Sequence, residues 1–229
     1  MRRADQKRTT VPTPRARRRS VLATSRCRDD VVAGRRTSGS HRESISDTMP
    51  GISPIRPHLL ITGRPGIGKT TLIRHVAERL APQAAGFYTL EVRDAAGRRV
   101  GFEIVTLEGQ RRLLAHVDFQ SPYRVSRYGV DLSAMEAVAV PALERGLAAE
   151  AITLLIVDEI ARMELFSRAF VRVLEQILAS PKRLIATIQQ SAHPVIEQIR
   201  ARADVELWEL TPTNRSEVLA RLLERLRAS

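Results

Sequence analysis

The chain has 229 residues, and 43% of them are hydrophobic, which suits one α/β domain with a sizeable core and is short for two domains. No apolar stretch approaches the ~18 residues that a membrane-spanning helix requires, so no membrane partner is expected. The net charge of +12 is concentrated in residues 1–57, which carry 14 Lys and Arg against 5 Asp and Glu, so the charge is weak evidence for nucleic-acid binding by the rest of the chain.

The single cysteine, Cys27, excludes an internal disulfide and favours a reducing, cytoplasmic compartment. Residues 1–57 are rich in Arg, Ser and Thr and show no period, so they are expected to form a basic disordered extension. Three interpretations of this extension stay open: a true start at Met49, a basic tail that contacts RNA or another acidic surface, and an organelle-targeting peptide. Residues 58–229 are the expected folded domain.

The first half of this domain alternates apolar runs with glycine-containing turns. The first run is of the type found in buried parallel strands, and the apolar positions after the glycine loop recur on one helix face. Two strand-like segments on either side of "AAG" predict an antiparallel β-hairpin. The expected order is a strand (58–62), a glycine loop (63–70), a helix (69–80), the two hairpin strands (86–94 and 98–107), a short strand (113–117) and a loop (118–129).

The second half alternates helical periodicity with short apolar runs. Ser133 is predicted to cap the first of these helices, and Thr211 to cap the last, with Pro212 in its first turn. Because strands alternate with helices, the pattern predicts a mostly parallel sheet flanked by helices. The expected helices are 131–150, 162–180, 193–203 and 211–228, and the expected strands between them are 152–159, 183–189 and 204–210.

The segment "GRPGIGKT" fits the phosphate-binding pattern G-x-x-x-x-G-K-[ST] and lies between a predicted strand and a predicted helix. Its glycines let backbone N–H groups approach a phosphate at a helix N-terminus. Lys69 is expected to bridge the β- and γ-phosphates, and the Thr70 hydroxyl to bind Mg²⁺. Only three of the 37 basic residues are lysines, and one of them occupies this position. The expected nucleotide contacts in this segment are Gly63, Arg64, Pro65, Gly66, Ile67, Gly68, Lys69, Thr70 and Thr71.

The apolar run "LLIVDE" ends in two carboxylates. Asp158 at the end of a buried strand can hold the Mg²⁺ water shell, and Glu159 can polarise a water beside the γ-phosphate. These two residues complete the expected nucleotide and metal site, although Glu159 can also be read as a solvated charge that caps the following helix. Tandem carboxylates favour hydrolysis over transfer to another acceptor, because water needs a nearby base.

Hydrolysis also requires a positive charge on the γ-phosphate in the transition state. Arg162, one turn beyond Glu159, is the first candidate. The other candidates for this charge are Arg64, Arg124 and Arg127, and Gln189, which ends a predicted strand, is a candidate γ-phosphate sensor. The alternative is that each arginine is an ordinary surface residue and that Gln189 is an ordinary amide at a strand end.

No N-K-x-D pattern for guanine selection is present, so weak discrimination between bases is expected. Phe87, Tyr88 and Tyr123 can stack on a base, with the alternative that they belong to the hairpin core. Asn214 and Arg215 can hydrogen-bond to one, with the alternative that they belong to the first turn of the last helix. His75 and His116 lack metal-ligand spacing.

Several segments occur in an order that resembles the cancer-related nucleoside-triphosphatase family, which are small P-loop NTP phosphohydrolases of bacteria, archaea and animals. They are "ITGRPGIGKTTLI", "GFYTLEVRDAAGRRVGFEIVTLEG", "RYGVDL", "LIVDEIARMELFS", "IATI" and "TPTNR", within residues 58–217. The resemblance implies a RecA-like α/β fold and Mg²⁺-dependent release of γ-phosphate from ATP, GTP and other NTPs by a slow enzyme. Two residues depart from the family pattern: Ala161 replaces a usual glycine, and Leu90 replaces a usual acidic residue.

The motifs and the resemblance together predict a nucleoside-triphosphatase that uses Lys69, Glu159 and Arg162 in catalysis and Thr70 and Asp158 on Mg²⁺. They do not specify the oligomeric state, and a monomer is the default expectation. Its partner is the nucleoside triphosphate. One alternative is a P-loop kinase of a nucleotide, a nucleic-acid end or a small molecule, with hydrolysis as a side activity. A second is a non-enzymatic RNA-associated module that acts through the basic tail.

Overall fold

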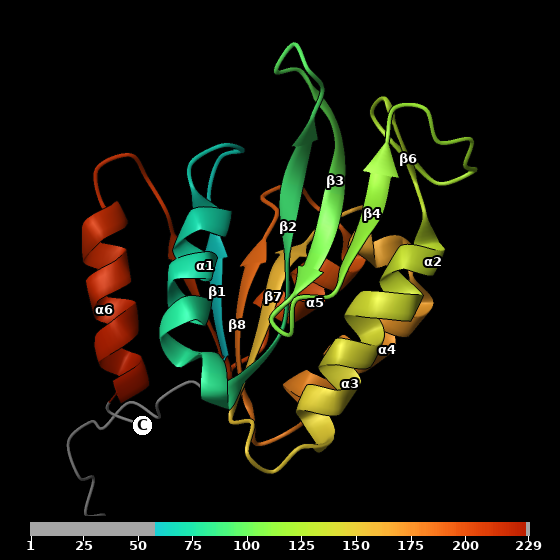
Figure 1. Cartoon of the computed structure of the whole chain (residues 1–229). Helices are drawn as coiled ribbons and strands as arrows, with labels where there is room; N and C mark the ends of the chain where they lie inside the picture. Colours follow the sequence, from blue (N-terminus) through green and yellow to red (C-terminus); the bar gives the residue numbers. More distant parts are fainter. Residues whose placement is uncertain (1–57, 228–229) are drawn as a thin grey trace, which may run out of the picture. The chain divides into compact units, whose positions relative to one another are not determined.

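A computed structural model describes residues 58–227 of the chain. Within this range the strands form a nine-stranded sheet in the order β5-β6-β4-β3-β2-β7-β8-β1-β9 (Figure 1). The strands are β1 (His58–Thr62), β2 (Ala84–Arg93), β3 (Arg99–Thr106), β4 (Arg111–His116), β5 (Arg124–Val125), β6 (Tyr128–Val130), β7 (Leu154–Ile160), β8 (Arg183–Ile188) and β9 (Val205–Glu209). The basic extension, Met49 and the RNA interpretation lie outside the described residues.

The sheet has a parallel half and an antiparallel half, which meet in β2. Strands β7, β8, β1 and β9 pair in parallel, and β2 joins them through residues 84–87. Beyond that point β2 continues as one strand of the predicted hairpin with β3, and β4, β6 and β5 extend the antiparallel half. The prediction of a loop at 118–129 is wrong in part, because β5 and the start of β6 form there.

Helices cover both faces of the sheet. The helical segments are α1 (Lys69–Leu80), η1 (Ala81–Gln83), α2 (Leu132–Ala134), η2 (Met135–Ala139), α3 (Val140–Ala148), η3 (Glu164–Phe166), α4 (Arg168–Leu178), α5 (Pro194–Arg200) and α6 (Arg215–Arg227). Buried side chains of α1 and α6 form one hydrophobic cluster with β1 and β7. Those of α3, α4 and α5 form the other cluster. No helix among residues 58–227 is long and apolar enough to cross a membrane.

Three predicted helices differ from the observed ones for local reasons. The helix at 131–150 is capped by Asp131, whose side chain accepts the Ser133 N–H, so the prediction that Ser133 is the cap is wrong. Pro141 lacks an N–H group, and a π-helical turn, η2, precedes it.

The predicted helix at 162–180 is interrupted, because the Ser167 hydroxyl accepts the Phe170 N–H and starts α4 there. The last helix begins at Arg215 and not at Thr211. The Thr211 N–H donates to the Asn214 side chain, so Thr211 and Pro212 belong to the preceding turn.

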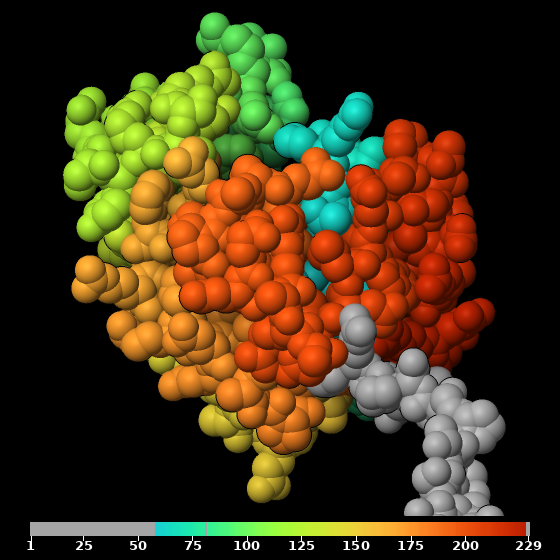
Figure 2. All heavy atoms as spheres, turned by 180° about the vertical axis from the view of Figure 1, so that it is seen from behind, coloured from blue at the N-terminus to red at the C-terminus, as the bar shows by residue number. Residues whose placement is uncertain are grey.

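In the view from behind (Figure 2), cyan atoms of the β1–α1 region lie exposed between the green hairpin and the red C-terminal helix.

Candidate active site

The glycine loop follows β1 directly and leads into α1, as predicted. Gly66 and Gly68 have φ values of +76° and +101°, in the left-handed region that favours glycine. The Ile67 N–H donates to the Arg64 carbonyl, and the Leu72 N–H donates to the Gly68 carbonyl as α1 begins. The free N–H groups at the start of α1, together with the helix dipole, make this loop a site for an anion.

Lys69 lies in this loop with a side chain that is only 9% exposed. Its Nζ donates to the Gly63 carbonyl at 3.2 Å and lies 3.4 Å from Glu159 Oε1. Burial raises the pKa of the Glu159 carboxyl, and the Lys69 charge partly opposes this. Glu159 therefore faces the loop lysine, while Ser167 caps the helix that follows.

Asp158 is 1% exposed and lies under the loop at the end of β7. Thr187 Oγ1 donates to its Oδ1 at 2.5 Å, whereas Oδ2 makes no hydrogen bond of normal geometry within residues 58–227. Burial raises the pKa of Asp158, and the Thr187 and Thr70 hydroxyls and the Thr89 N–H oppose this. A carboxylate oxygen beside a threonine hydroxyl suits Mg²⁺, which takes few protein ligands and several oxygens from phosphate and water.

A cleft of about 740 Å³ extends from the loop toward the hairpin. Of the predicted residues, those that line it come from the loop, the end of β7 and the end of β8: Gly63, Pro65, Gly66, Gly68, Lys69, Thr70, Thr71, Glu159 and Gln189. Gln189 reaches it because β8 pairs with β1. Arg64 is exposed and, like Ile67, does not line this cleft. No group of three His, Cys, Asp or Glu suited to a metal occurs among the described residues.

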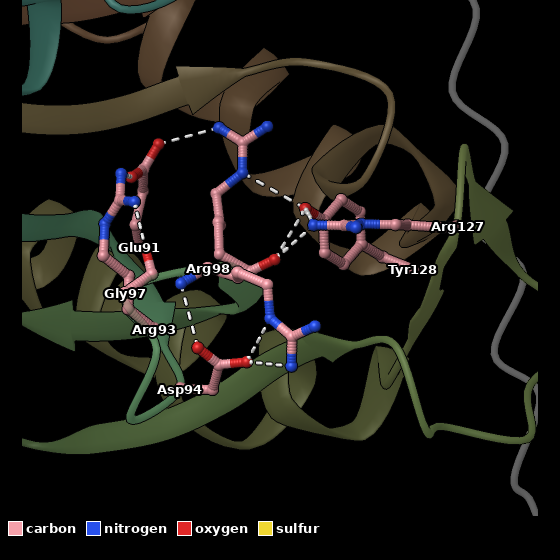
Figure 3. Close-up of polar contacts among 8 residues, drawn as sticks. Glu91, Arg93, Asp94, Gly97, Arg98, Arg127 and Tyr128 are labelled. Atoms are coloured by element: carbon pink, nitrogen blue, oxygen red, sulfur yellow. Dashed lines mark hydrogen bonds and ion pairs between the residues drawn. The ribbon is translucent and has the colours of Figure 1, made fainter.

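Arg162 is exposed and lines a second, smaller cavity that also contains Glu159. Its backbone N–H donates to Gln189 Oε1 at 3.2 Å. Arg124 instead donates to the carbonyls of Phe119 and Arg127, so the structure does not bring it to the loop. Arg127 packs over the Tyr128 ring, as Figure 3 shows, and donates to the Arg99 carbonyl; it does not line the cleft.

Two cleft arginines, Arg74 and Arg99, were not predicted as site residues. Arg74 lies one turn beyond Thr70 on α1, a spacing that is visible in the sequence. Arg99 Nη1 lies 2.7 Å from Glu91 Oε1, and its Nε donates to the Tyr128 hydroxyl at 3.1 Å. Figure 3 shows Glu91 and Tyr128, the two residues that the Arg99 side chain contacts. Only the strand register brings Arg99 to the cleft, so no local signal could have found it.

The candidates for base contacts divide between the core and the surface. Phe87 is fully buried and packs edge-on against Phe170, so the alternative of a core role is confirmed for it. Tyr123 packs against Phe166 and does not line the cleft. The Asn214 amide is occupied by backbone contacts, whereas the Arg215 guanidinium lies beside Gly68.

Arg215 also lines a cavity of about 210 Å³ that contains His75. Tyr88 lies under Arg74, whose guanidinium carbon is 5.6 Å from the ring centroid. Arg215 is therefore a base-contact candidate that the fold places beside the glycine loop.

Glu164, which the sequence placed within a helix, is 4% exposed, and burial raises its pKa to about 8. The folded chain therefore binds a proton that the unfolded chain releases near pH 4.5, and the free energy of unfolding should fall by up to ~1.4 kcal/mol per pH unit between these two pKa values. We expect Glu164→Gln to flatten this fall in urea unfolding at pH 5 to 8 without nucleotide. Glu175→Gln, an exposed control on α4, should keep the wild-type slope, and parallel curves for all three proteins would contradict the assignment.

Known proteins are similar in sequence to this chain over most of its length. A protein family described as NTPase matches residues 58–223. The chain is 48% identical over 169 residues to the nucleoside-triphosphatase THEP1 of Thermotoga maritima, covering 74% of this chain and 95% of that protein. It is 37% identical over 186 residues to the human cancer-related nucleoside-triphosphatase, covering 75% of this chain and 97% of that protein.

A solved structure agrees with the sequence relatives. The crystal structure of THEP1 from Aquifex aeolicus superposes with a TM-score of 0.67 at 39% identity, and the match covers 73% of this chain and 97% of that one. The residues matched by the family, 58–223, include every strand of the described sheet. The chain therefore belongs to the NTPase family, and it is an enzyme of that family.

Proposed function

We propose that the protein hydrolyses the γ-phosphate of ATP, GTP and other nucleoside triphosphates with Mg²⁺, releasing the diphosphate and inorganic phosphate. The observation that carries this proposal is the contact between Lys69 Nζ and Glu159 Oε1 at 3.4 Å, at the loop end of the cleft. It places the group that would bind phosphate beside the group that would activate water. The names of the matched relatives support the same reaction class.

The resting contact of Lys69 explains how binding and chemistry can be linked. The loop N–H groups and Lys69 would hold the phosphates, and Lys69 would exchange Glu159 for phosphate oxygens. Glu159 would then be free to orient a water in line with the γ-phosphate and accept its proton. Thr70 and Asp158 would hold Mg²⁺, which neutralises charge on the β- and γ-phosphates. Arg162, beside Glu159, is proposed to stabilise charge on the transferred phosphate.

Phosphate release from ATP, GTP, CTP and UTP by the full chain tests the proposal. We expect release from all four nucleotides at rates within about tenfold of one another, because one missing base contact changes binding by about 1.4 kcal/mol. Lys69→Ala should abolish release and weaken nucleotide binding at least about tenfold. Lys182→Ala is the matched control, since Lys182 binds the Gly146 carbonyl far along the chain. Release by Lys69→Ala at the wild-type rate would contradict the proposal.

The extension of the cleft past Glu159 favours a second candidate, a P-loop kinase. Leu90, Arg99 and Phe102 line this further part, which has room for an acceptor beside the γ-phosphate. If the protein is a kinase, γ-labelled ATP should label a nucleotide, a nucleic-acid end or a small molecule faster than it releases phosphate. Phosphate release that no added acceptor slows would exclude this candidate.

The remaining proposals concern the surroundings of the enzyme. We propose a cytoplasmic monomer, and sedimentation of the full chain at several concentrations tests the oligomeric state. A contact between residues 1–57 and RNA also stays a prediction. Removal of residues 1–48 should abolish such binding, and the affinity of the full chain for RNA should fall steeply as the salt concentration rises.

A further inference from the structure

A small chamber lies next to the cleft, and Glu159 lines both. The chamber has a volume of about 160 Å³ and shares Thr89, Phe102, Ala161 and Gln189 with the cleft as well. It differs from the cleft in containing Glu164 and Arg162 and none of the loop residues. The chamber is therefore adjacent to the catalytic carboxylate without belonging to the phosphate site.

Glu164, which lines this chamber, is unusual for a carboxyl group because it is buried and one of its oxygens is unsatisfied. It is 4% exposed, and its Oε2 makes no hydrogen bond among the described residues. No arginine, lysine or histidine among residues 58–227 lies close enough to lower its pKa. The backbone N–H groups of Glu164 and Ala161 interact with this carboxyl, but Oε2 is left unsatisfied. A buried oxygen without a hydrogen bond costs free energy, so a polar partner that protein atoms do not supply is expected at Oε2.

Water is the partner that the chamber can hold. A water molecule occupies about 30 Å³ of liquid, and buried waters sit where several polar groups meet. Glu159, Gln189 and Glu164 give the chamber wall three such side chains. The charges of Glu159 and Asp158 are also close enough to raise the pKa of Glu164, after burial as the main cause. A neutral Glu164 carboxyl has an O–H to donate.

We propose that Glu164 is a positioning residue: its carboxyl donates a hydrogen bond, through water held in this chamber, that holds the Glu159 carboxylate where it can activate the water that attacks the γ-phosphate. Glu159 needs such support when nucleotide binds, because Lys69 then leaves it for the phosphates. The local backbone fits this role. The short η3 helix carries Glu164, and the Ser167 cap ends that turn and fixes its position against α4. The proposal rests on the proposed function, in which Glu159 activates water.

The test compares two replacements of similar size. Glu164→Gln keeps an N–H donor, whereas Glu164→Met keeps the length and loses every donor. We expect Glu164→Met to lower kcat for ATP at least about tenfold, as a misplaced catalytic group does, with an unchanged Kd for a non-hydrolysable ATP analogue. Glu164→Gln should stay within about threefold of wild type. Equal kcat values for the two variants would overturn the proposal, because a structural role alone does not distinguish a donor from a thioether.

A double-variant cycle tests whether Glu164 acts through Glu159. In a Glu159→Gln background, Glu164→Met should produce little further loss, since the group that it positions is already inactive. A further loss of the same factor would overturn the proposal, because Glu164 would then act independently of Glu159. If Glu159→Gln alone retained the wild-type rate, the proposed role of Glu159 in activating water would fail, which is a separate outcome. Glu175→Gln and the melting temperature of each variant control for general effects on folding.

Discussion

Glu159→Gln is expected to lower the turnover number for ATP by about 10³-fold, within the range that a positioned general base contributes. Gln has the shape of Glu but cannot accept a proton from water. Glu159 Oε1 lies 3.4 Å from Lys69 Nζ, and the side chain lines the cleft with the loop glycines. The substitution therefore removes the acceptor without removing the phosphate-binding groups.

Nucleotide binding separates this result from loss of the site. Neutralising Glu159 removes the resting partner of Lys69, so the Kd for ATP should stay the same or decrease. Single-turnover phosphate release and equilibrium binding of a fluorescent ATP analogue measure the two effects. Glu175→Gln is the control for a Glu to Gln exchange at a distance from the cleft. Release at the wild-type rate would assign water activation to another group.

The loop and the tandem carboxylates were predictable because local sequence determines both. Strand β1 ends at Thr62, where the glycines begin, and the apolar run of β7 ends in Asp158 and Glu159. Carboxyl ends of parallel strands lie at one edge of a sheet, so two such motifs are expected to meet. The pairing of β7 and β1 with β8 between them meets that condition, and it also brings Gln189 to the cleft.

The position of Glu164 was not predictable from helical periodicity. Apolar residues continue at helical spacing from 162 to 180, and this pattern hides the break at Ser167. A serine that precedes an apolar run is a known helix start, and here it outweighs the periodicity. The break gives residues 164–166 their own turn and buries Glu164. The antiparallel half of the sheet similarly depends on pairings between β4 and β6 that no local pattern specifies.

Gly86→Ala is expected to destabilise the fold by roughly 3–5 kcal/mol, because two costs combine at this position. Gly86 has a φ of +131°, and a Cβ added there would lie 1.9 Å from the Ile156 carbonyl oxygen. It pairs with Ile156 where β2 joins the parallel half of the sheet. Since the obstacle is backbone, β2 and β7 must separate for the methyl group to fit.

Gly97→Ala is the matched control, since Gly97 has a φ of +77° and a Cβ there meets nothing within 4 Å. It carries the cost of the left-handed backbone alone, about 1–2 kcal/mol. Thermal and urea unfolding of both variants measure the difference, which should appear as a melting temperature roughly 5 °C or more lower for Gly86→Ala. Equal stability of the two would contradict the β2–β7 register. Because Thr89, three residues along β2, lies beside Asp158, a shifted β2 should also lower the rate of phosphate release.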